Sequence, residues 1–357
     1  MMAMAGRLQV LSSPTAAPVA ASSPCHHHRR LAWSRRPDPT RSSSIVAASS
    51  SSSSSSSTIS KGNKVVTLEL TYLEINSWVW EVQQQGQGQS SPMRILVDPL
   101  VVGNLDFGAP WLFDGAKKNP KVKALGVDDL LALEPGLLLI TQSLDDHCHV
   151  RTLTQLSARA PELPVVTTPN AQPVLASLPT PFRRVTYLEP GQSTAVNAQL
   201  RVVATAGPVL GPPWQRPENG YVLIAGADDG GHGLLYYEPH CVYDDSSFFL
   251  PDKRRQLQAD VVITPVVKQL LPANFTLVSG QEDAVRLASL LRARYVVPMS
   301  NGDVDAGGLL AAVISKQGTT QSFEAKLSAA LPGQVQVLQP TPGVPLQLEL
   351  DIIPQNQ

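Results

Sequence analysis

A cluster of polar side chains follows a short apolar run near the middle of the chain. Leu137–Ile140 is entirely apolar, and Asp146, His147 and His149 follow soon after it. A buried strand that ends in such residues delivers them to the edge of a sheet, where a substrate reaches them. Imidazole and carboxylate groups bind zinc or iron, so this segment predicts a site for one such ion.

A second polar pair follows the predicted strand at 234–237. Glu238 and His240 come at its end, and we expect their loop to lie at the same edge as the first cluster. The predicted metal ligands are His147, His149 and His240, with Asp146 or Glu238 as ligand or general base. Three protein ligands and a water molecule would supply a hydrolytic nucleophile. If His147 and His240 share one ion, their imidazoles should approach within roughly 5 Å.

The same residues also have a purely structural interpretation. Asp146 is placed to cap a helix that begins near His149. His147 is then a hydrogen-bonded histidine at the edge of the sheet, without an ion. The sequence alone leaves both interpretations open.

Two cysteines each follow a histidine in these loops. If the loops are neighbours, Cys148 and Cys241 are candidates for a redox-switchable disulfide. The alternative is that both are small, buried and inert. The third cysteine, Cys25, lies near the N-terminus, and so few cysteines exclude a disulfide-stapled secreted domain.

Composition excludes several classes of protein. The net charge is −1, and the first 60 residues contain six arginines and one acid, so the remaining chain is acidic. An acidic body without a basic stripe argues against nucleic-acid binding. No segment reaches the roughly 18 unbroken apolar residues that span a bilayer. A small-molecule ligand or substrate is therefore the expected partner, while the oligomeric state is not defined.

Residues 1–60 have the composition of an organelle transit peptide. They are rich in Ser, Ala, Pro and Arg and end in the serine run Ser49–Ser57. Abundant serine favours the chloroplast, and the absence of a second apolar targeting segment favours the stroma over the thylakoid lumen. A merely disordered tail is the alternative. Residues 61–357 are expected to form the folded domain.

The order of predicted elements indicates two sheets packed face to face with helices outside. This predicts an α/β (α+β) fold with four αββα layers. Strands are expected at 65–72, 78–82, 95–97, 137–141, 164–167, 200–205, 220–225, 234–237, 261–264, 295–298 and 346–350. Helices are expected at 127–133 and 150–160, after a capping box of Ser279 and Glu282, and after Asp303, where Leu309 and Val313 would face the core.

The stretch Thr141–His147 resembles the ligand motif of the metallo-β-lactamase superfamily, Thr-His-x-His-x-Asp-His. Asp146 and His147 match its last two residues. The segment Ile95–Pro99 resembles a strand of the lactonase-like branch that ends in Asp-Pro. The segments Asn219–Tyr221 and Tyr295–Pro298 resemble the superfamily's hairpin after the third metal histidine and its strand before the last one. The resemblance implies the four-layer metallo-β-lactamase sandwich and hydrolysis of small esters, lactones or phosphoesters.

The chain also departs from that motif. Gln142 and Leu144 stand where the first two metal-binding histidines are expected, and Gly207–Gly211 and Met299–Asp303 contain no histidine. The standard two-metal site uses about five histidines. After residue 60 this chain has only four histidines, which are His147, His149, His232 and His240. We therefore expect at most one metal ion, in a hydrolase with a reduced site or in a non-catalytic binding or scaffold protein (a pseudoenzyme).

Overall fold

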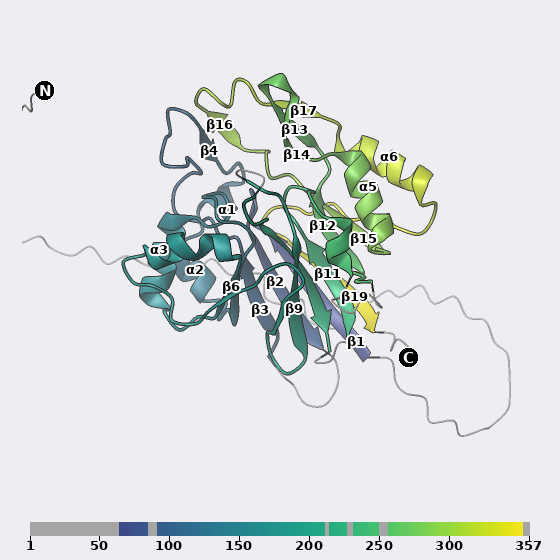
Figure 1. The fold of residues 1–357 in the computed structure, drawn as a ribbon, viewed down its shortest axis with the longest axis horizontal. Helices are drawn as coiled ribbons and strands as arrows, with labels where there is room; N and C mark the ends of the chain where they lie inside the picture. The colour runs from purple at the N-terminus through teal and green to yellow at the C-terminus, as the bar shows by residue number, and fades with distance from the viewer. Residues whose placement is uncertain (1–63, 85–90, 211–213, 227–230, 250–255, 353–357) are drawn as a thin grey trace, which may run out of the picture. The chain divides into compact units, whose positions relative to one another are not determined.

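The computed structural model describes residues 64–84, 91–210, 214–226, 231–249 and 256–352. The predicted transit peptide, residues 1–60, lies outside these ranges. Within them the strands form two seven-stranded sheets, one three-stranded sheet and one two-stranded sheet (Figure 1). No helix in the described ranges is long and apolar enough to cross a membrane.

The first large sheet combines the N-terminal strands with the last strand of the described chain. In order, its strands are β19 (Pro345–Ile352), β1 (Lys64–Tyr72), β2 (Trp78–Gln84), β3 (Met93–Val97), β5 (Leu137–Ile140), β6 (Val165–Thr167) and β7 (Val185–Tyr187). β19, β1, β2 and β3 pair antiparallel, and β3, β5, β6 and β7 pair parallel. The predicted closing strand is confirmed as β19.

The second large sheet has the same mixture of parallel and antiparallel pairs. In order, its strands are β18 (Gln336–Val337), β15 (Tyr295–Met299), β12 (Val261–Pro265), β11 (His232–Tyr237), β10 (Asn219–Ala225), β9 (Leu200–Ala206) and β8 (Ser193–Ala195). β11, β12, β15 and β18 pair parallel, whereas β8, β9, β10 and β11 pair antiparallel.

The main core lies between the two sheets and follows from alternation along the strands. In β5, Leu137 and Leu139 join the cluster between the sheets, whereas Leu138 and Ile140 join a cluster on the outer face. In β11, Tyr237 lies in the cluster between the sheets and Tyr236 on the outer face of the second sheet. Strands buried on both faces need apolar side chains in both directions, which explains their unbroken apolar runs.

Helices cover the outer face of each sheet and complete the predicted four layers. Those on the first sheet are α1 (Pro120–Lys123), α2 (Val127–Leu131), α3 (Val150–Arg159), η1 (Pro169–Ala171) and α4 (Gln172–Ala176). Those on the second are η2 (Asp245–Phe248), α5 (Gln281–Leu290) and α6 (Thr320–Ala330) (Figure 1). The expected αββα architecture is confirmed.

The prediction of a helix after Asp303 is wrong. That segment instead contributes β16 (Asp305–Gly307), which pairs with β4 (Asp114–Ala116), and β17 (Ser315–Gln317), which forms a sheet with β13 (Lys268–Leu271) and β14 (Phe275–Val278), the last two joined by η3 (Pro272–Asn274). Gly308 has a φ of +88°, and the amides of Leu309 and Leu310 donate to the carbonyls of Trp111 and Leu112. Their hydrogen bonds therefore leave the segment instead of closing helical turns.

The N-terminus of α5 also differs by one residue from the prediction. Gly280, and not Ser279, is the N-cap, because the Ala284 amide donates to the Gly280 carbonyl at 3.1 Å. The Ser279 amide donates instead to the carbonyl of His240 at 2.8 Å. This bond ties the start of α5 to the loop that follows β11.

Two leucine substitutions distinguish the predicted and observed environments of the segment after Asp303. We expect Leu309→Ala to change the free energy of unfolding by less than about 0.5 kcal/mol, because the side chain is 65% exposed. Leu327→Ala in α6, where the leucine is buried, should lower it by about 2–5 kcal/mol. Urea denaturation measures both, and a loss above about 1 kcal/mol for Leu309→Ala would contradict the observed exposure.

Candidate metal centre

The predicted polar residues meet where strands of both sheets end. Asp146 and His147 come from the loop after β5, and His240 comes from the loop after β11. Their ligand atoms lie within 4.8 Å of one another, and the two imidazole rings are 5.2 Å apart between centroids. The side chains of Asp146 and His240 each remain 14% exposed, whereas His147 is fully buried. The cluster is therefore partly exposed to solvent through Asp146 and His240.

Asp98 fixes the orientation of His147. Its Oδ2 lies 2.9 Å from His147 Nδ1, and its Oδ1 accepts a 2.8 Å hydrogen bond from the Thr141 amide. The Thr141 hydroxyl donates to the same carboxylate at 2.5 Å. The acceptor beside Nδ1 keeps a proton on that nitrogen and leaves Nε2 to face the cluster, as in metal sites where a carboxylate orients a histidine ligand.

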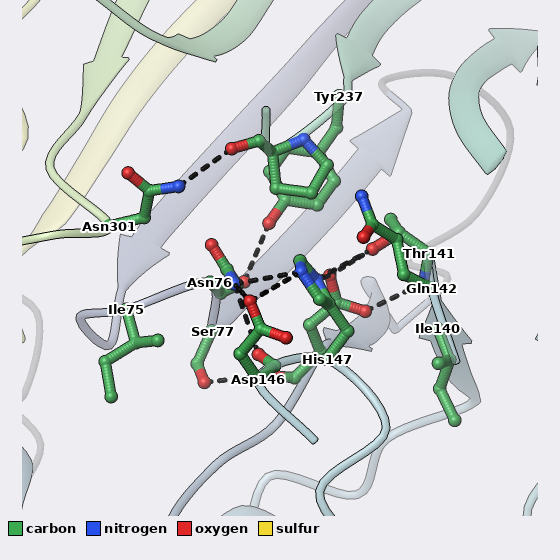
Figure 2. Close-up of polar contacts among 12 residues, drawn as sticks. Ile75, Asn76, Ser77, Ile140, Thr141, Gln142, Asp146, His147, Tyr237 and Asn301 are labelled. Atoms are coloured by element: carbon green, nitrogen blue, oxygen red, sulfur yellow. Dashed lines mark hydrogen bonds and ion pairs between the residues drawn. The ribbon is translucent and has the colours of Figure 1, made fainter. Parts of the chain in front are cut away.

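Asp146 completes a buried sequence of carboxylate, imidazole and carboxylate. Its Oδ2 lies 3.0 Å from His147 Nε2, and the Asn76 Nδ2 lies 3.1 Å from each of these two atoms. Figure 2 shows the side chains of Asn76, Asp146 and His147 pointing toward one another. Asn76 belongs to the turn between β1 and β2, and its own carbonyl accepts a 2.8 Å bond from the Tyr237 hydroxyl.

These contacts shift the pKa values of His147 and Asp146 in opposite directions. Burial alone would lower the pKa of His147, but the charges of Asp146 and Asp98 outweigh it and raise the pKa to about 10. Burial alone would raise the pKa of Asp146, but His147 and His240 outweigh it and lower that pKa. Without a cation, a proton between these groups compensates the buried negative charge.

Gln142 and Glu238 hold His240 in place. The Gln142 Nε2 lies 2.7 Å from His240 Nδ1 and 3.4 Å from Glu238 Oε1. Both carboxylate oxygens of Glu238 lie 3.1 Å from the His240 amide, and Oε2 also accepts from the Val242 amide at 2.6 Å. Because backbone donors occupy Glu238, its role here is to shape the loop that carries His240.

His149 lies outside the cluster. Its Nδ1 is 2.8 Å from the Thr152 hydroxyl, and its Nε2 is 3.9 Å from Asp145 Oδ2. Burial, with the charges of Arg151 and Lys117, lowers its pKa to about 4. His149 is the N-cap residue of α3, and Asp145, not Asp146, accepts from the Val150 amide at 3.2 Å.

The structure contradicts the disulfide considered above. Cys148 and Cys241 are free and buried in different apolar clusters, one on the outer face of each large sheet. Burial raises both thiol pKa values well above the usual range, so neither forms a reactive thiolate near neutral pH. The alternative of small, inert cysteines fits this arrangement.

The cluster fits a divalent cation. Two imidazoles and a carboxylate are the donors that zinc and iron take in proteins. Three buried oxygens at the cluster also lack any hydrogen-bond partner among the described residues: Asn76 Oδ1, Gln142 Oε1 and Asp146 Oδ1. Unpaired buried acceptors are costly, and Asp146 Oδ1 belongs to a residue of the three-donor cluster, where a bound cation would compensate it. Asn76 was not singled out from the sequence as a site residue.

Comparison with known proteins gives a family and a fold. Residues 69–300 match the family model described as "Beta-lactamase superfamily domain". The structure of Igni18, a metallo hydrolase from Ignicoccus hospitalis, superposes with a TM-score of 0.52 at 16% identity, covering 80% of this chain and all of that one. An isothiocyanate hydrolase from Delia radicum gut bacteria gives 0.49 at 16% identity, covering 78% and 98%. No curated protein matches the chain.

The raised pKa of His147 predicts a loss of stability at alkaline pH in the metal-free protein. Its folded pKa of about 10 exceeds the ordinary 6.5, so the stabilisation is complete below pH 6.5 and is lost as pH rises through 10. Urea denaturation in the presence of a chelator should show this decline in the wild type and a much flatter profile in His147→Gln. Parallel profiles would contradict the buried imidazolium.

His149 predicts the opposite dependence in acid. Its folded pKa of about 4 lies below the ordinary 6.5, so the unfolded chain binds the proton more tightly and stability falls as pH drops from 6.5 to 4. His149→Gln should remove this part of the acid destabilisation. His232→Gln is the control, because His232 lies away from both His149 and the metal cluster. Equal acid profiles for wild type and His149→Gln would contradict the neutral, buried imidazole.

Proposed function

Because this chain belongs to the beta-lactamase superfamily and brings Asp146, His147 and His240 together, we propose that it is a single-metal hydrolase. The proposed substrates are small esters, lactones or phosphoesters. When bound, a divalent cation activates water for attack on such bonds. The observation that carries the proposal is the convergence of three donors within 4.8 Å beside three unpaired buried oxygens.

Each residue of the cluster has a proposed part. His147 and His240 would hold the ion through ring nitrogens, and Asp146 would hold it through a carboxylate oxygen. Asp98 keeps the proton on His147 Nδ1 and so presents Nε2 to the ion. Asp146 Oδ1, which has no partner among the described residues, is placed to accept a proton from the attacking water. Glu238 positions His240 through backbone amides and is not the base.

The proposed location is the chloroplast stroma. It is supported by the composition of residues 1–60, where six arginines accompany a single acid and a long serine run.

A non-catalytic binding or scaffold protein is the second candidate. The observation that favours it is the way in which the cluster is bonded without an ion, through His147 and the amides of Asn76 and Gln142. A site that is satisfied by protons and amides also suits a protein that has kept the fold and lost the chemistry.

Metal content separates the two candidates. We expect the purified full-length chain to retain about one equivalent of zinc, iron or manganese, and His147→Ala or His240→Ala to reduce this at least tenfold. The wild-type chain and every variant should carry His26→Ala, His27→Ala and His28→Ala, so that residues 1–60 contribute no histidine ligands. His232→Ala is the control, because His232 lies 2.8 Å from Asp260, outside the cluster. Metal content far below one equivalent, unchanged by either substitution, rejects the single-metal hydrolase.

A further inference from the structure

Two carboxamides turn their nitrogen sides toward the candidate metal centre. The Asn76 Nδ2 approaches Asp146 Oδ2 and His147 Nε2 at 3.1 Å each. The Gln142 Nε2 approaches His240 Nδ1 at 2.7 Å. The Asn76 amide also donates to the Asp146 carbonyl at 3.2 Å, and the Gln142 amide donates to Glu238 Oε1 at 3.4 Å. Both amide nitrogens therefore lie against residues of the candidate metal centre.

The oxygen of each carboxamide is left without a partner. Asn76 Oδ1 and Gln142 Oε1 are both buried and accept no hydrogen bond from the described residues. Gln142 is fully buried, and Asn76 is 1% exposed, so bulk water does not reach either oxygen. A buried acceptor without a donor is energetically unfavourable. Both oxygens would gain a partner if their carboxamides turned them toward a bound cation.

A half-turn about its last side-chain bond exchanges the oxygen and nitrogen of a carboxamide without changing its shape. After such a turn, Asn76 Oδ1 would lie where Nδ2 now lies, near Asp146 and His147. Gln142 Oε1 would likewise lie beside His240. Ligand atoms around one first-row divalent ion lie about 3 Å apart, because each sits about 2.1 Å from the metal. The present nitrogen positions match that spacing.

We propose that Asn76 and Gln142 are additional metal ligands whose carboxamides turn their oxygens inward when a divalent cation binds. The proposal rests on the proposed function, since it assumes an ion at Asp146, His147 and His240. It adds two oxygen donors to one carboxylate and two imidazoles. Oxygen-rich sites of higher coordination number suit manganese or iron(II) better than zinc, which favours four ligands. The proposed substrate class stays the same, but the expected metal is manganese or iron(II) and not zinc.

Asn301 provides a matched control. It lies near the same loop, where its Nδ2 donates to the carbonyl of Pro239 at 2.8 Å (Figure 2). Its Oδ1 accepts from the Gln269 Nε2 at 3.0 Å. Both ends of this carboxamide are hydrogen-bonded, so turning it would break both bonds, and we expect it to stay in place when a cation binds. Its replacement tests the effect of losing a nearby amide that is not a ligand.

Calorimetric titration of the metal-stripped full-length chain with manganese and zinc chloride tests the proposal. The background again carries alanine at His26, His27 and His28. We expect Gln142→Leu and Asn76→Leu to weaken manganese binding about 10- to 100-fold and zinc binding less. Gln142→Glu, which keeps an oxygen donor, should bind manganese at least as tightly as the wild type. Asn301→Leu should leave both affinities within about twofold of the wild type, because its carboxamide bonds Pro239 and Gln269 and not the three-donor cluster.

Side-chain amide NMR gives a second readout that does not depend on affinity. The NH₂ signals of Asn76 and Gln142, assigned from their absence in the leucine variants, should shift when diamagnetic zinc is added. The NH₂ signal of Asn301 should stay in place. This measurement uses the wild-type chain, and the Gln142 signal decides the question even if Asn76→Leu fails to fold.

The outcomes separate this inference from the function on which it rests. If the wild type binds neither metal, the proposed function fails and the inference fails with it. If the wild type binds metal, but Gln142→Leu keeps its manganese affinity and the amide signals do not move, the inference alone is overturned. Weakened manganese binding in Gln142→Leu with recovery in Gln142→Glu supports the carboxamide ligands.

Discussion

A buried imidazole between two carboxylates is the interaction on which the rest of the site depends. His147 has no exposed surface, and its nitrogens lie 2.9 Å from Asp98 and 3.0 Å from Asp146. Removing one member of such a buried arrangement costs about 3–5 kcal/mol, because a charge is left uncompensated. Asp98 itself is fixed by a left-handed backbone, φ 42°, directly after β3 and by the amide and hydroxyl of Thr141. The edge of the first sheet therefore sets the direction of the imidazole before any ligand arrives.

The second sheet supplies the other half of the site, so the packing between the sheets determines its geometry. The Tyr237 hydroxyl bonds the Asn76 carbonyl at 2.8 Å, and the Asn219 amide bonds the Thr141 carbonyl at 3.0 Å. Gln142 then meets His240 across the same boundary. Large apolar side chains between the sheets, such as Trp80 and Leu139, hold these partners in register. A change in core volume would thus misplace donors that never touch the substituted residue.

The fold was largely predictable because strand periodicity and glycine or proline punctuation are local signals. The site was only partly predictable. Asp146, His147 and His240 follow strand ends, and that placement brings them together. His149 does not join them because the chain enters α3 at that residue and turns its imidazole toward Thr152. Asn76 depends on left-handed backbone at Glu74 and Ile75, φ 63° and 58°, which spacing does not reveal. The helix prediction for the segment after Asp303 was wrong because amides of this segment donate to a distant part of the chain.

The two positions that depart from the ligand motif have different physical consequences. Leu144 is 44% exposed, and only its carbonyl serves the site, accepting from the His147 and Cys148 amides at 3.0 and 2.7 Å. Its side chain has left the cluster entirely. Gln142 is fully buried beside His240 and retains an oxygen donor. At one of these positions the side chain therefore lies away from the cluster, and at the other an amide lies against His240. If a cation binds at the cluster as proposed, the amides of Gln142 and Asn76 would have to give up their present contacts with His240 and Asp146.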